Sequence, residues 1–281
     1  MSFNRKLEKP AIANLISSSL WTSHLESNCK NQNIFLAVRN NSIGIYHKGG
    51  KLFSFEKNEF KTHIKYASVI YNSENDYLTE NELSKNKLIT DFKNNYSRIK
   101  ENCRLYSGIE ALGVSEIYHK YSYLTKNNIV VLDIEISFEA LEKTTGKKQD
   151  RIDILLYNLE TRTLKFVEAK HFSNPEIWSK STPKVIGQIK KYETQIKTNK
   201  TEIIAAYKNY IQAINSVFNL ELPFPEKVEE KVTLLIFGFD NDQKNGRLQN
   251  LILKNPEFKR FQVYCKQDKI NPSPLWRSKI L

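Results

Sequence analysis

Three consecutive apolar runs that carry acidic residues constrain the fold of this chain most. They read "NIVVLDIEISF" at 128–138, "RIDILLYN" at 151–158 and "KFVEAKHF" at 165–172. Each has the length and apolar content of a buried strand. The link "LETRTL" between the last two is short enough for a hairpin. The sequence therefore predicts that the second and third runs pair as neighbours in one sheet.

Helical patterns lie on both sides of these runs. An amphipathic stripe of Val185, Ile189 and Ile196 predicts a helix after Pro183. The other expected elements are a helical stretch over 85–122 with a break near Gly108 or Gly113, a helix over 202–218, a strand in "KVTLLIFGFD" (231–240), a polar helix over 243–254 and a strand in "FQVYC" (261–265). Bundled strands followed by alternating helices and strands are typical of an α/β fold with a mixed central sheet in three layers.

The first part of the chain has a different pattern. Residues 1–30 are expected to be helical, and "NIFLAVRNNSIGIYHKGGKLFSFE" predicts a meander of hairpins with turns at Asn40-Asn41 and Gly49-Gly50. Thr79 and Glu82 have capping-box spacing at the start of a helix. We therefore expect an N-terminal β-rich lobe or decoration over 1–80, and one α/β domain over 81–281.

Charged residues inside the second and third runs are the candidate functional residues. Asp153 lies among Ile152, Ile154 and Leu155, where a charge is costly unless it is paired or holds a metal. If the two strands form a hairpin, Asp153 can lie beside Glu168. Glu168 and Lys170 leave the same face of their strand, because side chains alternate with a period of two.

Two adjacent carboxylates repel each other and favour a cation between them. Hard oxygen ligands suit Mg²⁺, with Mn²⁺ as the alternative, and Mg²⁺ also binds substrate phosphates. Lys170 could stabilise charge that develops on a phosphate. The plainer alternative is that Glu168 and Lys170 form a solvated ion pair and that Asp153 ends a β-turn.

The combination of Asp153 with Glu168-Ala169-Lys170 resembles the PD-(D/E)XK nuclease superfamily, which has the restriction-endonuclease-like fold. Gln188 and Tyr192 in "GQIKKYE" are similar to the QxxxY helix signature of its exonuclease-like branch. The resemblance covers about half of the chain and implies that Asp153, Glu168 and the backbone carbonyl of Ala169 bind the metal.

The resemblance also implies roles for other residues. Lys170 would act on the attacking water or the transition state. Gln188 would orient a metal-bound water or phosphate, and Tyr192, one helical turn later, would contact the nucleic-acid backbone. A further acid is expected before Asp153. Glu135, embedded among apolar residues on the first strand, is the first choice, and Glu110 on the preceding helix is the second.

The charge of the chain agrees with a polyanionic partner. There are 43 Lys and Arg against 31 Asp and Glu, a net charge of +12. Four lysines on the helix after Pro183 are candidate phosphate contacts: Lys184, Lys190, Lys191 and Lys197. Trp178, in the preceding loop, either stacks on a base or packs under the loop. The bland alternative for the lysines is a solvated helix face.

The sequence thus predicts a Mg²⁺-dependent nuclease that hydrolyses phosphodiester bonds, with DNA as the expected substrate and defence, restriction or repair as candidate roles. The alternatives are a nucleic-acid-binding protein that keeps the fold without turnover, and a basic surface for another anion such as a lipid. Three widely spaced cysteines indicate neither a disulfide framework nor a zinc site. We expect a cytoplasmic protein without a membrane segment, and the oligomeric state stays open, a homodimer included.

Overall fold

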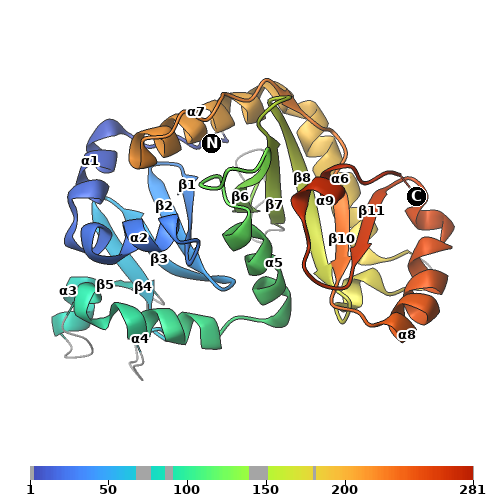
Figure 1. Cartoon of the computed structure of the whole chain (residues 1–281), viewed down its shortest axis with the longest axis horizontal. Helices are drawn as coiled ribbons and strands as arrows, with labels where there is room; N and C mark the ends of the chain where they lie inside the picture. The colour runs from blue at the N-terminus through green and yellow to red at the C-terminus, as the bar shows by residue number, and fades with distance from the viewer. Residues whose placement is uncertain (1–2, 68–76, 86–90, 139–150, 180–181, 281) are drawn as a thin grey trace. The chain divides into compact units, whose positions relative to one another are not determined.

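The three apolar runs form adjacent strands of one sheet, as the sequence predicts (Figure 1). The structure is a computed structural model that describes residues 3–67, 77–85, 91–138, 151–179 and 182–280. Strands β6 (Ile129–Ile136), β7 (Ile152–Asn158) and β8 (Thr163–His171) pair antiparallel in sequence order. The expected hairpin between the second and third runs is confirmed.

Two further strands extend this sheet in parallel. Strand β10 (Thr233–Phe237) pairs with β8, and β11 (Gln262–Lys266) pairs with β10. The order is β11-β10-β8-β7-β6, and the short β9 (Lys227–Val228) also pairs with β8. The α/β class and the mixed sheet are therefore confirmed.

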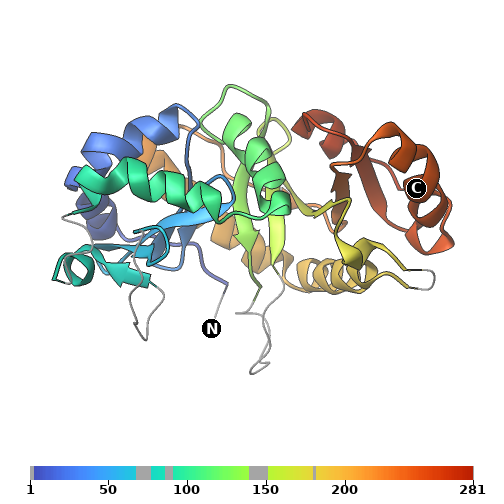
Figure 2. The same ribbon diagram turned by 90° about the horizontal axis from the view of Figure 1, so that it is seen from below.

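Helices cover both faces of the six-stranded sheet. Lys165 of β8 donates a hydrogen bond of 2.7 Å to the carbonyl of Trp276 in α9 (Pro272–Trp276), so α9 lies on the face to which Lys165 points. Glu168 and Lys170 point to the opposite face, since alternate side chains of a strand leave opposite faces. Figure 2 shows α6 (Lys184–Thr198) on the other side of the sheet from α9. Helix α6 therefore covers the face that carries Glu168 and Lys170.

The remaining helical segments after β8 are short, apart from α7. They are η3 (Pro175–Ile177), α7 (Lys200–Phe218), α8 (Asn241–Gln243), the π-helix η4 (Lys244–Leu253) and η5 (Pro256–Phe258). The polar helix expected over 243–254 corresponds to η4 with the end of α8. Gly238 follows β10 with a φ of +75°, and any side chain there would collide with the ring of His171. This glycine allows the ends of β10 and β8 to approach closely.

The N-terminal part of the chain forms an antiparallel sheet in the order β1-β2-β3-β4-β5. Its strands are β1 (Phe35–Arg39), β2 (Ser42–His47), β3 (Gly50–Glu56), β4 (Glu59–His63) and β5 (Tyr77–Thr79). The turn at Asn40-Asn41 is confirmed. The second turn lies one residue earlier than expected, at Lys48-Gly49, because these two residues have φ of 47° and 87° while Gly50 already belongs to β3.

Other helices lie before and after the strands of this antiparallel sheet in the chain. They are α1 (Lys9–Ser17), η1 (Trp21–Leu25), α2 (Glu26–Lys30), α3 (Glu80–Lys85), α4 (Phe92–Leu105) and α5 (Ile109–Lys120). The capping box is confirmed, since the Thr79 amide donates to Glu82 Oε2 at 2.6 Å and the Glu82 amide donates to Thr79 Oγ1 at 3.2 Å. The break between α4 and α5 includes Gly108, whereas Gly113 lies inside α5.

The chain divides into two compact units whose limits differ from the expected boundary at residue 80. The N-terminal unit comprises Asn4–Ser115 and Ala206–Leu222, and the C-terminal unit comprises Met1–Phe3, Glu116–Ala205 and Pro223–Leu281. Packing explains the difference. In the N-terminal unit the ring centroids of Phe53 and Phe92 lie 5.1 Å apart, and those of Trp21 and Phe218 lie 5.6 Å apart. Helix α4 and the second half of α7 thus complete its core.

None of the helices in the described ranges combines the length and the apolar character needed to cross a membrane.

Candidate active site

Three acidic residues lie in one row across β6, β7 and β8. Strands β7 and β8 pair Ile154 with Val167, so the same register places Asp153 opposite Glu168 one step further along. Strands β6 and β7 pair Ile134 with Ile154 and Ile136 with Ile152, which places Glu135 opposite Asp153. The row arises because the three strands are adjacent and antiparallel.

The surroundings of Asp153 raise the pKa of its carboxyl. Burial raises the pKa of its carboxyl well above the ordinary value, and the charge of Glu168 is the next largest cause, with Glu135 adding to it. The amide of Ala169 donates to Asp153 Oδ2 at 2.7 Å and, with Lys170, acts in the opposite direction. Asp153 is thus a crowded carboxylate that a cation would stabilise.

Glu168 and Lys170 form a buried ion pair rather than the solvated pair of the plainer alternative. Their side chains are 2% and 8% exposed, and Lys170 Nζ lies 2.9 Å from Glu168 Oε1. Lys170 Nζ also lies 3.1 Å from Oε2 of Glu176, in the short helix η3. Glu176 is not among the residues predicted from the sequence, because a glutamate in a polar loop carries no signal of its own.

Glu135 has an unusual backbone conformation, with a φ of +51°. This region is uncommon for a residue with a side chain, and such residues occur frequently at functional sites. Its carboxylate lies 3.5 Å from a guanidinium nitrogen of Arg151. Glu110, the second choice for the additional acid, lies in the first turn of α5, within the N-terminal unit. Glu135, by contrast, lies in the C-terminal unit, in the same row as Asp153 and Glu168.

Gln188 and Tyr192 both lie on α6, where Tyr192 is buried and Gln188 is half-buried. The Gln188 Oε1 atom is buried, and no hydrogen-bond donor contacts it in the described part of the chain. A buried carbonyl oxygen without a donor is costly, so a water or ligand is expected there. Tyr192 is 2% exposed and belongs to the buried stripe of α6, so the expected contact with a nucleic-acid backbone is not available at the surface.

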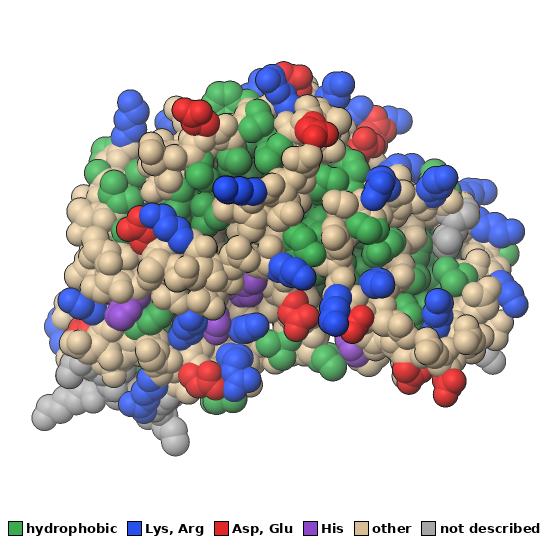
Figure 3. Space-filling model, in the orientation of Figure 1, with side chains coloured by type: hydrophobic (Ala, Val, Ile, Leu, Met, Phe, Trp, Pro, Cys, Tyr) green, Lys and Arg blue, Asp and Glu red, His purple; other side chains and the backbone are tan. Residues whose placement is uncertain are grey.

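The four candidate lysines of α6 are exposed, on the side away from the buried stripe: Lys184, Lys190, Lys191 and Lys197. Figure 3 shows that Lys and Arg side chains are spread over the face in view rather than gathered at one place. The four lysines are therefore exposed on the helix that covers the face carrying the acids, without forming a distinct basic patch in this view.

Trp178 packs under its loop, which was one of its two expected positions. Its indole N–H donates to the Phe172 carbonyl at 2.7 Å, and its ring meets that of Phe172 edge to face at 4.7 Å. The guanidinium of Arg247, in η4, lies 4.1 Å from the centre of the indole ring. These contacts anchor Trp178 against the residues that directly follow β8.

The donor chemistry of the site suits a hard divalent cation. Within the described ranges, no group of three or more His, Cys, Asp or Glu has metal-binding geometry. Asp153 and Glu168 offer two facing carboxylates, and Mg²⁺ usually binds through one or two carboxylates while keeping several waters. The residues present therefore fit Mg²⁺ better than a metal that needs a full set of protein ligands.

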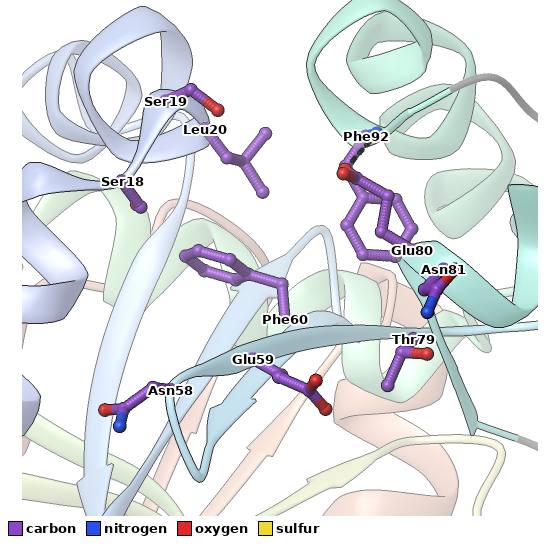
Figure 4. A pocket seen from close by; sticks show the side chains of 10 residues that line it. All are labelled: Ser18, Ser19, Leu20, Asn58, Glu59, Phe60, Thr79, Glu80, Asn81 and Phe92. Atoms are coloured by element: carbon purple, nitrogen blue, oxygen red, sulfur yellow. Dashed lines mark hydrogen bonds between the residues drawn. The ribbon is translucent and has the colours of Figure 1, made fainter.

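A separate pocket of about 250 Å³ lies in the N-terminal unit (Figure 4). Figure 4 shows Leu20, Phe60 and Phe92 around the pocket, and the Phe92 amide donates to Glu80 Oε2 at 2.5 Å. The other lining residues are Ser18, Ser19, Asn58, Glu59, Thr79 and Asn81. Because none of the ten lining residues is basic, this pocket offers no cation for a phosphate group.

Comparisons with protein families, with curated proteins and with solved structures give no match to this chain. Its function is therefore inferred from the residues of the site.

Proposed function

We propose that this chain is a Mg²⁺-dependent nuclease of the PD-(D/E)XK type that hydrolyses phosphodiester bonds in DNA. The observation that carries the proposal is the arrangement of Asp153 opposite Glu168, with Lys170 two residues further along the same strand. The order of elements also supports it. Helix α5, strands β6, β7 and β8 and helix α6 occur in the order expected for the restriction-endonuclease-like core, and strand β10 comes after the additional helix α7 and the short strand β9.

Each residue of the site has a proposed role. Asp153 and Glu168 would hold the metal, with the Ala169 carbonyl as a further ligand and with Glu135 nearby in the same row. When bound, Mg²⁺ would lower the pKa of a bound water and polarise a phosphoryl oxygen. The ammonium of Lys170 would stabilise the charge that develops on the phosphate in the transition state. Gln188 Oε1 would accept a hydrogen bond from a water at the site, and the α6 lysines would bind backbone phosphates.

Cleavage assays test this proposal directly. Purified protein is incubated with plasmid, single-stranded and branched DNA and with RNA, in Mg²⁺, in Mn²⁺ and in EDTA. We expect metal-dependent cleavage that Asp153→Ala and Lys170→Ala abolish, whereas Asp242→Ala and Lys126→Ala, which change exposed residues of the same types, leave it intact. Cleavage that persists in folded Asp153→Ala would exclude the proposed site.

One observation favours a second candidate, a nucleic-acid-binding protein that keeps the fold without turnover. Lys170 is held by two carboxylates, Glu168 and Glu176, so its ammonium is already neutralised within the protein. DNA binding without cleavage in either metal would support this candidate over the nuclease.

A further inference from the structure

We propose that Glu176 is a positioning residue for the reaction, which places the ammonium of Lys170 and keeps it in place when Glu168 binds the metal. This inference rests on the proposed nuclease function. Glu176 Oε2 lies 3.1 Å from Lys170 Nζ, and Glu176 belongs to η3 rather than to the sheet. It therefore approaches the ammonium from a different element than Glu168 does.

The helix η3 is built to present Glu176. Asn174 caps it, since its side-chain oxygen accepts from the Glu176 amide at 2.9 Å. Pro175, at the first helical position, restricts the backbone, and Ile177 is fully buried. Trp178, held against Phe172, fixes the end of the turn. The carboxylate of Glu176 is therefore attached to a short, anchored segment rather than to a free loop.

Two carboxylates hold the ammonium of Lys170 in one position, which Glu168 alone would not do once it binds the metal. A lysine ammonium sits on a flexible four-carbon stem and has no fixed direction by itself. Glu168 is at once the ion-pair partner of Lys170 and a proposed metal ligand, so a bound divalent cation competes with Lys170 for its oxygens. The side chain of Glu176 is 33% exposed, and that of Lys170 is 8% exposed. Because Glu176 is not one of the proposed metal ligands, it supplies a second contact that holds the ammonium near the site when the metal is bound.

The chain contains a matched control for Glu176. Helix η5 repeats the same arrangement, with Asn255 as the cap, Pro256 at the first position and Glu257 next. The Glu257 amide donates to the Asn255 side chain at 2.9 Å, the same distance as in η3, and Glu257 is exposed. Glu257→Gln thus makes the same chemical change in the same kind of turn, away from the ion pairs of Lys170.

Steady-state cleavage kinetics test the role in the reaction. We expect Glu176→Gln to lower kcat by about 10- to 100-fold, because small displacements of a reacting group have effects of this size. KM for DNA should change by less than about threefold, since Glu176 does not bind the substrate. Glu176→Asp should recover part of kcat, and Glu257→Gln should match the wild type. A kcat of Glu176→Gln within about twofold of wild type would overturn the inference.

A double-mutant cycle on thermal unfolding in EDTA tests the contact without activity. Glu176→Gln should lower Tm in the wild-type background, and should lower it by less than half as much in the Lys170→Met background, because the ion pair is absent there. Equal losses in the two backgrounds would show that Glu176 does not hold Lys170 and would overturn the inference.

The two experiments separate this inference from the proposed function. If the wild type cleaves and Lys170→Ala does not, normal turnover in Glu176→Gln refutes the positioning role alone. If the wild type cleaves no nucleic acid, the proposed function fails and the catalytic role of Glu176 fails with it, while the unfolding cycle still decides whether the ion pair exists.

Discussion

The carboxylate of Asp153 lowers the stability of the folded chain, and the same carboxylate is suited to bind a cation. Its carboxyl has a raised pKa because it is buried and because Glu168 lies opposite. A carboxylate in such surroundings destabilises the folded chain at neutral pH, since the unfolded chain keeps it in water. That cost is recovered when a cation binds, which is why such acids are typical of metal sites.

The first prediction follows from this cost. Asp153→Asn should raise the unfolding free energy of the metal-free protein by about 1 kcal/mol, because it removes the repulsion with Glu168 while the amide oxygen can still accept from Ala169. Thermal unfolding in EDTA measures this. Added Mg²⁺ should raise the Tm of the wild type and leave that of the variant unchanged. Asp242→Asn, an exposed acid, is the control. A variant that is less stable than wild type in EDTA would contradict the prediction.

A second prediction at this scale concerns His47, at the end of β2. It is 6% exposed, its Nδ1 lies 2.7 Å from the Asn33 carbonyl, and burial is the main cause that lowers its pKa to about 4. Between about pH 6.5 and 4 the unfolded chain binds a proton at this ring that the folded chain does not. The stability that it contributes is therefore complete above about pH 6.5 and is lost as the pH falls toward 4.

Chemical denaturation at several pH values measures the effect. We expect His47 to account for a loss on the order of 2 kcal/mol between about pH 7 and pH 4, allowing for partial solvation of the ring. His47→Gln should show a shallower acid dependence by that amount. Parallel pH profiles for wild type and His47→Gln would rule out this role.

At the scale of elements, α6 carries residues for both the proposed catalytic site and the proposed binding of nucleic acid. Gln188 is half-buried beside the buried stripe of α6, while the lysines point to solvent. One helix would thus present an amide to the site and positive charge to a nucleic acid.

We therefore predict that the α6 lysines make phosphate contacts. Lys190→Ala combined with Lys197→Ala, two helical turns apart, should reduce the slope of log K against log salt by about 2, because each phosphate contact contributes about 0.9. Fluorescence anisotropy with labelled DNA in EDTA measures binding without cleavage. Lys57→Ala with Lys126→Ala makes the same charge change on exposed turns. Equal slopes for both pairs would assign the lysines to a solvated face.

The elements also show which local patterns can be predicted from sequence. The β7–β8 hairpin, the capping box of Thr79 and the helix α6 depend on neighbours in the chain, and all three are confirmed. The conformation of Glu135 and the burial of Tyr192 depend on how strands and helix pack. Spacing alone places Tyr192 beside Gln188 but does not say how deep its ring lies.

On the scale of the whole molecule, the chain returns to its N-terminal unit after much of the C-terminal unit has been built. Ala206–Leu222 belongs to the N-terminal unit, where Tyr210 donates to the Leu36 carbonyl at 3.4 Å and Phe218 packs on Trp21. A lobe limited to residues 1–80 would lack both this segment and α4.

This arrangement predicts how fragments behave. Residues 1–80 alone should not unfold cooperatively, and 1–115 should be less stable than the same fragment joined through a flexible linker to 206–222, because only the latter has the complete core. Circular dichroism and thermal unfolding compare the three polypeptides. A cooperative transition of the 1–80 fragment at the Tm of the linked polypeptide would contradict this division of the chain into two units.

The sequence by itself determined the strands of the C-terminal sheet, the pairing that brings Asp153 to Glu168, and the two faces of α6. These features could be predicted because they depend on the periodicity of side chains and on short loops, which allow few conformations. Only the tertiary structure decided that Glu176 joins Lys170, that Glu135 completes a row with Asp153, and that α7 returns to the N-terminal core. These contacts join residues whose positions depend on the packing of distant segments, and no local pattern encodes that packing.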